Sequence, residues 1–228
     1  KAVIGNIWWY FGLPPSETPS LLYSAVCLGY MEHAGGYIKG SSQQLSNALA
    51  AKINDNNGQI LLNTKVTRIL VSNDKAGGVI TDEGELFYSD VVISNAGAYE
   101  TVIEMIEETA FKKKYRNKIL RQDNSLSAIQ LYLGLDCSPD DLNLNIHSFT
   151  VFPTYDHDEN IRMIREGFYE QTMYSCMLYS AVDSSLAPNG KAVMNIFSLD
   201  LLSNWERLSK IEYENKKAQV TEALIKKA

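Results

Sequence analysis

The sequence of 228 residues has few cysteines and no long apolar run. Its three cysteines, Cys27, Cys137 and Cys176, are widely spaced, and no two of them have the spacing of a metal site or a redox pair. Their odd number and mostly apolar surroundings predict buried free thiols and a reducing, cytoplasmic compartment. No stretch approaches the roughly 18 apolar residues of a membrane-spanning helix, so these residues predict no such helix.

Neither an excess of basic residues nor a histidine cluster is present. The formal net charge is −6, whereas nucleic-acid-binding proteins carry a basic face, so we expect no nucleic-acid partner. Lys112–Lys114 and Arg116 form one basic cluster, which we interpret as a solvated helix face. His33, His147 and His157 have no ligand spacing with one another or with a cysteine, and no metal site is predicted.

A glycine-rich turn for phosphate groups is also missing. Dinucleotide cofactors are held where a GxGxxG sequence joins a strand to a helix, because backbone N–H groups and the helix dipole meet the pyrophosphate there. The chain has no GxGxxG, and we expect Gly77–Gly78 to lie in a hairpin turn with no helix after it. Ser184 and Ser185 lack the context of a nucleophile elbow, and no acid–base pair stands out. The residues therefore do not predict a complete catalytic site.

The stretch from Gly35 to Ala98 has a clear order of elements. Apolar residues at helical spacing predict a helix over 41–53, with Ser41 or Ser42 as its N-cap. Asn and Gly at 56–58 end it, because they tolerate the left-handed conformation. Expected strands and turns follow at 60–62 (strand), 66–71 (strand), 74–78 (turn), 79–81 and 86–88 (hairpin strands) and 91–93 (strand).

Residues 1–34 are expected to be helical with a break at Pro14–Pro15. One apolar helix is predicted over 2–11 and a second over 20–31. The second is apolar most of the way round, so we expect it to be buried on most sides. A further helix is predicted over 101–118 from its apolar side and its basic end.

The second half of the chain alternates strands and helices. Strands are expected at 126–135, where apolar residues alternate imperfectly, and at 146–152, 172–182 and 192–199. A short helix capped by Asp156 or Asp158 is expected at 158–167, and a charged helix over 204–228 that is interrupted near Lys210. This order predicts an α+β fold, in which one mixed or antiparallel sheet carries helices on one face. The segment before it contributes a β-hairpin.

Five segments in this order resemble one family. They are GGYIKGSSQQLSNALA (35–50), SDVVISNAGA (89–98), SLSAIQLYLGLD (125–136), HSFTVFPTYD (147–156) and DSSLAPNGK (183–191). Their order and spacing resemble the flavin-dependent phytoene desaturase, carotenoid isomerase and retinol saturase group, within the amine-oxidase-like flavoproteins. The resemblance spans most of 21–205. The chain departs from the family pattern at Ile38, where proline is usual, and at Ser41, where glycine is usual.

The resemblance implies a division into domains. Residues 1–34 and 98–228 would belong to the substrate domain, and residues 35–97 to the central part of the FAD-binding domain. The chain does not begin with Met and opens in apolar sequence. Together with the resemblance, this predicts an internal piece of a longer protein, with a processed mature terminus as the alternative. The family's phosphate-binding motif and its second flavin motif would then fall outside this chain.

Four residues are candidates for contact with FAD, as the resemblance implies. The backbone of Val66 would meet the adenine ring, and Ser94, Asn95 and Ala96 would form a turn of small residues close to the cofactor. The alternatives are an ordinary β-branched strand residue at Val66 and an ordinary strand-to-helix connection capped by Asn95.

Four further residues are candidates for contact with substrate. Tyr37 and Lys39 resemble the family's link between its two domains, where Lys39 would place a positive charge near the flavin or a substrate end. Tyr132 and Tyr179 fall on expected strands and would floor a cavity for a long apolar substrate. A solvated lysine and aromatic core residues are the respective alternatives.

The implied function is that of a fragment of an FAD-dependent oxidoreductase. The intact protein would desaturate, saturate or isomerise a long apolar or polyene substrate, with the cofactor performing the redox step. We expect the isolated chain to have no activity and no firm FAD binding. One alternative is a non-catalytic interaction module that contacts a membrane surface through residues 4–13. Another is an amine-oxidase-type enzyme with a polar substrate.

Overall fold

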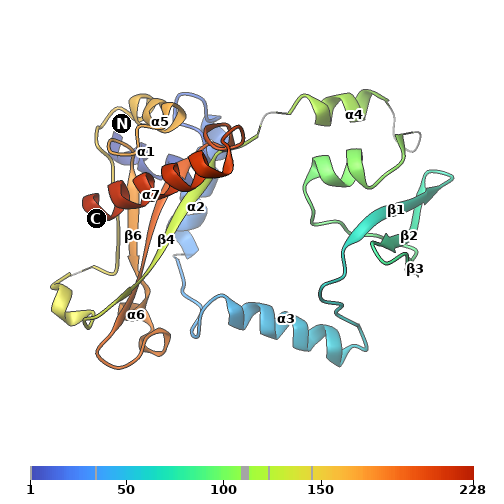
Figure 1. Ribbon diagram of the computed structural model, residues 1–228, viewed down its shortest axis with the longest axis horizontal. Helices are drawn as coiled ribbons and strands as arrows, with labels where there is room; N and C mark the ends of the chain where they lie inside the picture. The colour runs from blue at the N-terminus through green and yellow to red at the C-terminus, as the bar shows by residue number, and fades with distance from the viewer. Residues whose placement is uncertain (1, 34, 109–112, 123, 145) are drawn as a thin grey trace. The chain divides into compact units, whose positions relative to one another are not determined.

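The chain forms two compact units in the computed structural model, which describes residues 2–33, 35–108, 113–122, 124–144 and 146–228 (Figure 1). Unit 1 consists of Lys1–Ala48 and Asn124–Ala228, and unit 2 consists of Leu49–Asp123. Unit 2 is therefore inserted between two segments of unit 1. Whether the units correspond to the substrate and FAD-binding domains expected from the resemblance stays a prediction.

A four-stranded antiparallel sheet forms the centre of unit 1. Its strands, in the spatial order β4-β7-β6-β5, are β4 (Ser127–Leu135), β7 (Ala192–Asp200), β6 (Tyr174–Leu178) and β5 (Ser148–Val151). All neighbouring pairs are antiparallel, and Ile196 lies opposite Leu131 on one side and Cys176 on the other. The prediction of an α+β fold with an antiparallel sheet is confirmed.

Helix α7 (Lys210–Lys227) covers one face of this sheet, and Figure 1 shows it lying across the strands. Val220 and Leu224 of α7 form a buried cluster with Cys176 and Ile196 of the sheet. Ser209 caps the helix in a capping box with Glu212, which satisfies two backbone N–H groups at the start of the helix. Burial of apolar side chains between helix and sheet stabilises this layer by about 25 cal/mol per Å².

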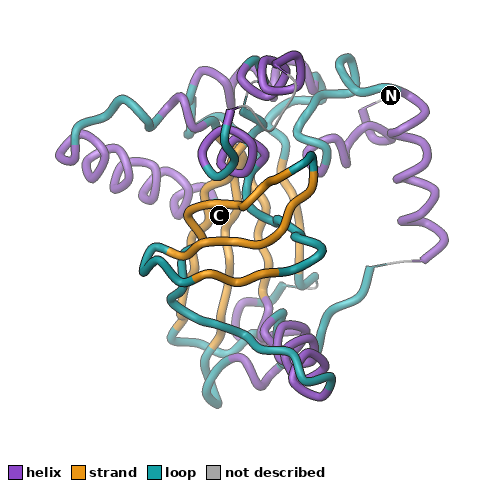
Figure 2. The backbone as a smooth tube through the Cα atoms, turned by 90° about the vertical axis from the view of Figure 1, so that its right-hand side faces the viewer, coloured by secondary structure: helices purple, strands orange, loops and turns teal. Residues whose placement is uncertain are grey.

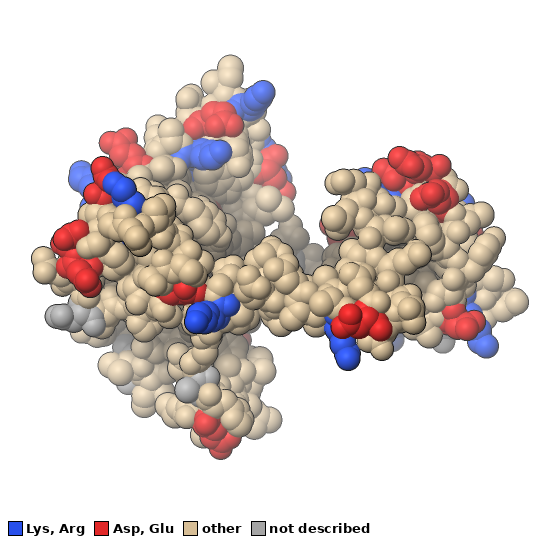
Figure 3. All heavy atoms as spheres, turned by 90° about the horizontal axis from the view of Figure 1, so that it is seen from below, with Lys and Arg blue, Asp and Glu red and all other residues tan. Residues whose placement is uncertain are grey.

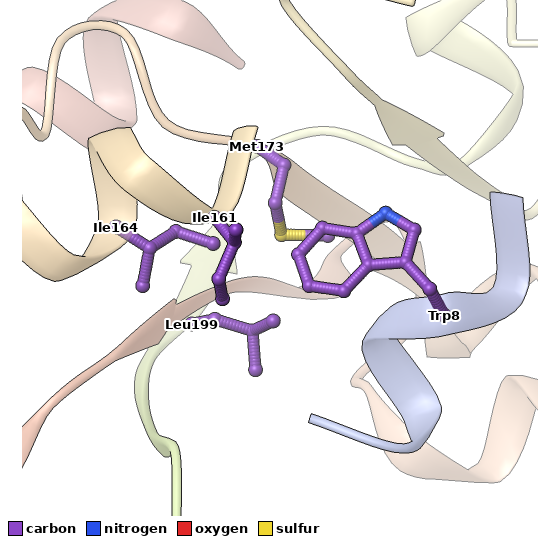
Figure 4. Packing of buried hydrophobic residues seen from close by; sticks show 5 residues of the cluster. All are labelled: Trp8, Ile161, Ile164, Met173 and Leu199. Carbon is purple, nitrogen blue, oxygen red and sulfur yellow. The ribbon is translucent and has the colours of Figure 1, made fainter. Parts of the chain in front are cut away.

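A second core cluster contains Trp8, which has no exposed surface. Figure 4 shows the Trp8 ring facing Met173, with Ile161, Ile164 and Leu199 around them. Side chains alternate between the two faces along a strand. Ile196 of β7 packs against α7, and Leu199, three residues later, points to the other face, so this cluster lies on the sheet face opposite α7. Met173 comes from the loop directly before β6, and Ile161 and Ile164 come from α5 (His157–Glu166), which Asp156 caps at its N-terminus.

The N-terminal segment does not form the single helix predicted over 2–11. It contains α1 (Ala2–Gly5) and then the 3-10 helix η1 (Asn6–Tyr10). The change comes at Gly5, a residue of low helix propensity, and the N–H of Phe11 bonds to the carbonyl of Trp8 in the tighter 3-10 pattern. The predicted turn follows, and α2 (Ser20–His33) begins after Pro19.

The prediction that the second helix is buried is wrong for this chain. No residue of α2 is buried; Leu21 is 83% exposed and Met31 80% exposed. The apolar composition of the helix predicted that other elements would pack against it. No described element of unit 1 buries its exposed side chains. The surface of α2 is therefore apolar and open.

The chain leaves β6 earlier than predicted. The strand ends at Leu178 and continues as the short helix α6 (Tyr179–Val182) and the 3-10 turn η5 (Ser184–Leu186). Asp183 lies between them, and its side chain accepts a hydrogen bond from the N–H of Ser185. The remaining 3-10 turns of unit 1 are η4 (Asp140–Leu142) and η6 (Leu202–Asn204).

Helix α3 (Gln43–Asp55) connects the two units. At its start, the hydroxyl of Ser41 accepts a hydrogen bond from the N–H of Gln43, 3.3 Å long. At its end, Asn57 has φ of 60° and the N–H of Gly58 bonds to the carbonyl of Ile53. Both ends agree with the helix predicted from the sequence, shifted by two residues.

A three-stranded antiparallel sheet forms the centre of unit 2, and the strands of both sheets are orange in Figure 2. Its strands are β1 (Val66–Ser72), β2 (Lys75–Thr81) and β3 (Leu86–Tyr88). The predicted hairpin of β2 and β3 is confirmed, with the turn at 82–84.

The predicted turn over 74–78 is wrong. The turn lies at Asn73–Asp74, where both residues have positive φ (50° and 61°) as a tight two-residue hairpin turn requires. Gly77 and Gly78 lie within β2 instead. A Cβ on Gly78 would stand 2.2 Å from the carbonyl oxygen of Phe87, so the two backbones can approach only because this residue is glycine.

Two predicted strands, 60–62 and 91–93, are not strands. Their apolar side chains are exposed, with Leu62 79% and Ile93 90% accessible. A strand needs a partner for its backbone N–H and C=O groups, and no strand in the described ranges pairs with either segment.

The predicted helix over 101–118 is divided. A π-helical turn, η2 (Glu100–Glu104), is followed by an irregular stretch, and α4 (Lys113–Leu120) begins later. The carbonyl of Met105 accepts the N–H of Ile69 in β1 at 2.8 Å, so it is used by the sheet and not by a continuing helix. Ala110, expected on the apolar side, and Lys112 of the basic cluster lie outside the described residues.

Candidate functional site

Three of the four tyrosine and lysine candidates for substrate contact lie together in unit 1. The rings of Tyr37 and Tyr179 are tilted against each other with 6.2 Å between their centroids. Burial raises the pKa of the Tyr179 hydroxyl, and the neighbouring Tyr132 and Tyr37 raise it further. The Tyr179 hydroxyl donates a hydrogen bond to Sδ of Met177, 3.3 Å long. We name Tyr37, Tyr132, Tyr179 and Met177 the aromatic cluster.

The sheet register explains why this cluster forms on one face. Tyr132 of β4 lies opposite Asn195 of β7, and Asn195 lies opposite Met177 of β6. The residues next to Tyr132, Leu131 and Leu133, pack in the core beneath α7. Because side chains alternate along a strand, Tyr132 lies on the other face, where it is 72% exposed.

Polar side chains near the cluster are largely engaged within the protein. Asn195 is buried, and its Nδ2 donates to the carbonyl of Leu131 at 3.2 Å. The Tyr132 hydroxyl donates to Oε1 of Gln130. The open face of the sheet at this end therefore presents mainly ring and thioether surface.

Lys39 is exposed and lies in the turn that follows Tyr37. The next residue, Gly40, donates its N–H to Oδ2 of Asp183 at 2.6 Å. Hydrogen bonds from the Ser185 hydroxyl and then from Gly40 lower the pKa of the Asp183 carboxyl, and the charge of Lys39 contributes to the lowering. Asp183 was not identified from the sequence, although its position before Ser184 and Ser185 is typical of a capping residue.

The four candidates for cofactor contact lie in unit 2. Val66 is the first residue of β1 and lies opposite Thr81. The hydroxyls of Ser94 and Thr101 are hydrogen-bonded at 2.7 Å, and Asn95 and Ala96 are exposed in irregular backbone. Val66 is thus paired with a neighbouring strand, whereas Ser94 bonds to a residue of η2.

These residues fit part of a flavin site. The small side chains and exposed backbone of 94–96 leave room for a close neighbour, and a strand end such as Val66 can offer backbone groups. No glycine-rich strand-to-helix turn is present to hold a pyrophosphate. The residues present would accordingly hold only a portion of the cofactor.

His157 is a core residue. It is buried, and its Nδ1 accepts a hydrogen bond from Nε1 of Trp8, 3.0 Å long. A cavity of about 320 Å³ beside it is lined by Val3, Asn6, Phe152, Pro153, Thr154, Tyr155 and His157. In the part of the chain that the structure describes, no group of three or more His, Cys, Asp or Glu residues could hold a metal ion.

Comparison with known proteins identifies the family. The family described as "Flavin containing amine oxidoreductase" matches residues 9–216. The chain belongs to this flavin-containing amine oxidoreductase family. The resemblance in the segment order is thereby confirmed.

Curated relatives in this family carry names from carotenoid and retinoid chemistry. The 4,4'-diapophytoene desaturase (4,4'-diapolycopene-forming) of Methylomonas sp is 30% identical over 82% of this chain and 36% of its own length. Prolycopene isomerase 1 of an Oncidium hybrid cultivar is 30% identical over 85% of this chain and 32% of its own length. All-trans-retinol 13,14-reductase of Danio rerio is 23% identical over 75% and 29%. The chain spans about a third of the length of these relatives.

Two solved structures share the fold. An oxidoreductase from Methanosarcina mazei aligns with a TM-score of 0.63 and 18% identity, over 96% of this chain and 46% of that one. A protein from Pyrococcus furiosus aligns with a TM-score of 0.61 and 21% identity, over 86% and 44%. The α+β fold of the flavin-containing amine oxidoreductase chain is thus found in known structures.

The surface shows how charge is distributed. On the face drawn in Figure 3, Lys and Arg side chains lie beside Asp and Glu side chains and do not gather in one basic patch. Among the helices that the structure describes, none has both the length and the apolar character to cross a bilayer.

Proposed function

We propose that this chain is part of an FAD-dependent oxidoreductase whose substrate is a long, apolar polyene. The observation that carries the proposal is the aromatic cluster on the sheet face opposite α7, beyond the part of that face covered by the Trp8 cluster. The relatives named for diapophytoene, prolycopene and retinol support a conjugated hydrocarbon chain as the substrate class. The reaction would be desaturation, saturation or double-bond isomerisation.

The side chains of the cluster suit such a substrate. Tyrosine rings and the Met177 thioether offer large polarizable surfaces, and contact with them gains dispersion energy without requiring a hydrogen bond from the ligand. Tyr132 and Tyr179 use their hydroxyls within the protein. Lys39 follows Tyr37 of the cluster by two residues. It would place a positive charge near the flavin or one end of the substrate.

The residues that we propose to contact FAD all lie in unit 2. Val66 would offer its backbone to the adenine, and Ser94, Asn95 and Ala96 would allow close approach of the cofactor. FAD, when bound, supplies the redox chemistry, while the protein supplies orientation and excludes water. Because the phosphate-binding turn is missing from the sequence, we expect the chain alone to have no activity and no firm affinity for FAD.

Polyene binding by the chain tests the proposed substrate class. All-trans-retinol is titrated into the protein and its fluorescence enhancement gives Kd. We expect saturable binding, weakened about ten-fold by Tyr132→Ala or Tyr179→Ala, because each removes roughly 1.4 kcal/mol of contact. Tyr155→Ala is the matched control, since Tyr155 is 85% exposed and lies in a different loop. Equal affinities for the wild type and all three variants would contradict the proposal.

A separate titration tests the expectation that the chain alone has no firm affinity for FAD. FAD fluorescence is followed as the chain is added at micromolar concentration. No saturable quenching is expected. Tight binding would show that the residues present suffice for the cofactor, against our expectation.

A membrane-surface module is the second candidate function, and one observation favours it. From Ala2 to Met31 the sequence has a single residue charged at neutral pH, Glu17, and Ile4, Leu21 and Met31 are all strongly exposed. An apolar, nearly uncharged surface of this kind suits the boundary of a lipid bilayer. Sedimentation with phosphatidylcholine vesicles tests it. Flavin-independent binding that is lost in a Leu21→Glu, Met31→Glu variant supports this function, and the absence of binding excludes it.

A further inference from the structure

The turn after Tyr37 is attached to a residue far along the chain. Gly40 N–H donates to Oδ2 of Asp183, 2.6 Å away, although 143 positions separate the two residues. Both residues belong to unit 1. Asp183 directly follows α6, the helix that begins with Tyr179. The same contact therefore joins the segment that carries Tyr37 to the segment that carries Tyr179.

The geometry of the turn leaves this amide available. Ser41 donates its N–H to the carbonyl of Ile38 at 3.0 Å, which closes a four-residue turn over 38–41. Gly40 holds the third position with φ of 81°, the value that a type II turn requires and that glycine adopts without strain. In such a turn the third N–H takes no part in the closing bond, so it needs an acceptor from elsewhere. Asp183 supplies that acceptor.

The two carboxylate oxygens of Asp183 have separate tasks. Oδ1 accepts from the N–H of Ser185 at 3.0 Å and from its hydroxyl at 2.6 Å, which caps the local turn η5. Oδ2 accepts from Gly40. The side chain is buried, and the same hydrogen bonds hold its pKa below the ordinary value. It is therefore a fixed, ionised acceptor at neutral pH, and bonds to such a group are stronger than those to a neutral one.

We propose that Asp183 is a positioning residue, whose carboxylate fixes the turn over 38–41 and so holds Tyr37 against Tyr179 in the aromatic cluster. The inference rests on the proposed function, because it takes the aromatic cluster as a substrate wall. Without the bond to Asp183, the turn is free to move and the Tyr37 ring leaves the wall. Polyene binding then weakens although the sheet is intact.

The variant Asp183→Asn tests this directly. Asparagine keeps one carbonyl oxygen for Ser185, but its amide nitrogen is a donor and faces the donor N–H of Gly40. We expect the nuclear Overhauser contacts between the Tyr37 and Tyr179 rings to disappear and Kd for retinol to rise about ten-fold. Ser185→Ala is the matched control, because it removes one bond to Oδ1 and leaves the bond to Gly40. Its ring contacts and retinol affinity should equal those of the wild type.

A double-variant comparison separates positioning from loss of stability. If Asp183 acts through Tyr37, then Asp183→Asn adds nothing to the retinol Kd of Tyr37→Ala. Independent, multiplying effects in the double variant would overturn the proposal. So would ring contacts that persist in Asp183→Asn.

The wild-type protein gives a further readout should Asp183→Asn fail to fold. Amide hydrogen exchange at neutral pH should show Gly40 protected, since its N–H is bonded to Asp183. An unprotected Gly40 amide overturns the proposal. If the wild type binds no retinol while Gly40 is protected and the ring contacts are present, then the proposed substrate class fails and the positioning role of Asp183 stands.

Discussion

Nε1 of Trp8 donates a hydrogen bond to Nδ1 of His157, and the two residues are 149 positions apart in the chain. The bond joins η1 to the first residue of α5, and the indole ring itself fills the core beside Met173. A single side chain thus provides both apolar packing and a directed bond between the two chain segments of unit 1.

Trp8→Phe should destabilise unit 1 markedly. The change removes the N–H donor and leaves a gap in a fully buried site, so the free energy of unfolding should fall by about 2–3 kcal/mol. Trp9→Phe is the control, because Trp9 is only half-buried and stacks on Tyr10. Urea unfolding followed by circular dichroism measures both, and equal effects of the two variants would contradict the central place of Trp8.

Gly78→Ala should weaken unit 2, whereas Gly77→Ala should not. A Cβ at Gly78 would collide with the Phe87 carbonyl oxygen, while a Cβ at Gly77 meets nothing within 4 Å. We expect Gly78→Ala to cost about 2 kcal/mol or more and Gly77→Ala less than about 0.5 kcal/mol. Hydrogen exchange of amides in β2 and β3 reports the difference, and similar exchange in the two variants would show that the strands are not this close.

Asp200 is a buried carboxylate whose replacement should be costly. It accepts hydrogen bonds from the Tyr169 hydroxyl (2.9 Å), Nδ2 of Asn204 (2.7 Å) and Nε1 of Trp205. Asp200→Asn turns one acceptor into a donor, and the free energy of unfolding should fall by about 3 kcal/mol. Asp136→Asn, at an exposed carboxylate paired with Lys191, should change it little.

The same substitution should alter the titration of Tyr169. Burial raises the pKa of the Tyr169 hydroxyl, and the charge of Asp200 raises it further. Asp200→Asn removes that charge, so the pKa of Tyr169 should move down toward its ordinary value. Ultraviolet titration of the phenolate measures this, and an unchanged or higher pKa would contradict the assigned cause.

Lys227 should make the stability of unit 1 depend on pH in the alkaline range. Burial lowers the pKa of its amine from 10.5 to about 8, against the opposing charge of Glu170. Between these two values the unfolded chain binds more protons than the folded one, so the free energy of unfolding should rise as the pH increases from about 8 towards 10. Below pH 8 both states are protonated and the folded state bears the whole cost of burying the charge.

Lys227→Met should remove this rise, and Lys226→Met, at an exposed neighbour, should keep it. Unfolding in urea at several pH values between 7 and 10 gives the slope for each protein. A rise that persists unchanged in Lys227→Met would show that another group causes it.

Elements whose stability is local were predictable from the sequence. Asp156 at the start of α5 and the alternation along β4 are short-range patterns, and both appear in the structure where they were expected. The turn at Asn73–Asp74 was also readable in principle, because these residues tolerate positive φ. The turn was predicted over 74–78 instead, because the nearby Gly77–Gly78 pair is also typical of turns.

Elements that depend on distant partners were not predictable. Residues 60–62 and 91–93 have strand-like composition, but composition does not supply a partner for the backbone. The apolar character of α2 likewise indicates that cover is needed without indicating whether this chain provides it.

The candidate site divides in the same way. Tyr132 and Tyr179 were predicted from expected strands, and Tyr37 from a segment resembling the family's interdomain link. Tyr132 lies on β4, whereas Tyr179 begins α6 and is not on a strand. The bond from Gly40 to Asp183 was not predicted, because no local pattern joins positions so far apart. The roles of Val66, Ser94, Asn95 and Ala96 stay predictions.

The insertion of unit 2 within unit 1 has a consequence for the order of events during synthesis. Trp8 leaves the ribosome long before Met173 and Leu199, its core partners, have been made. The strands of unit 2 all lie between Val66 and Tyr88. That sheet can therefore form before the core partners of the first segment have been synthesised. During this interval the nearly uncharged stretch 2–31 lacks its core partners, and exposed apolar surface of this kind promotes aggregation.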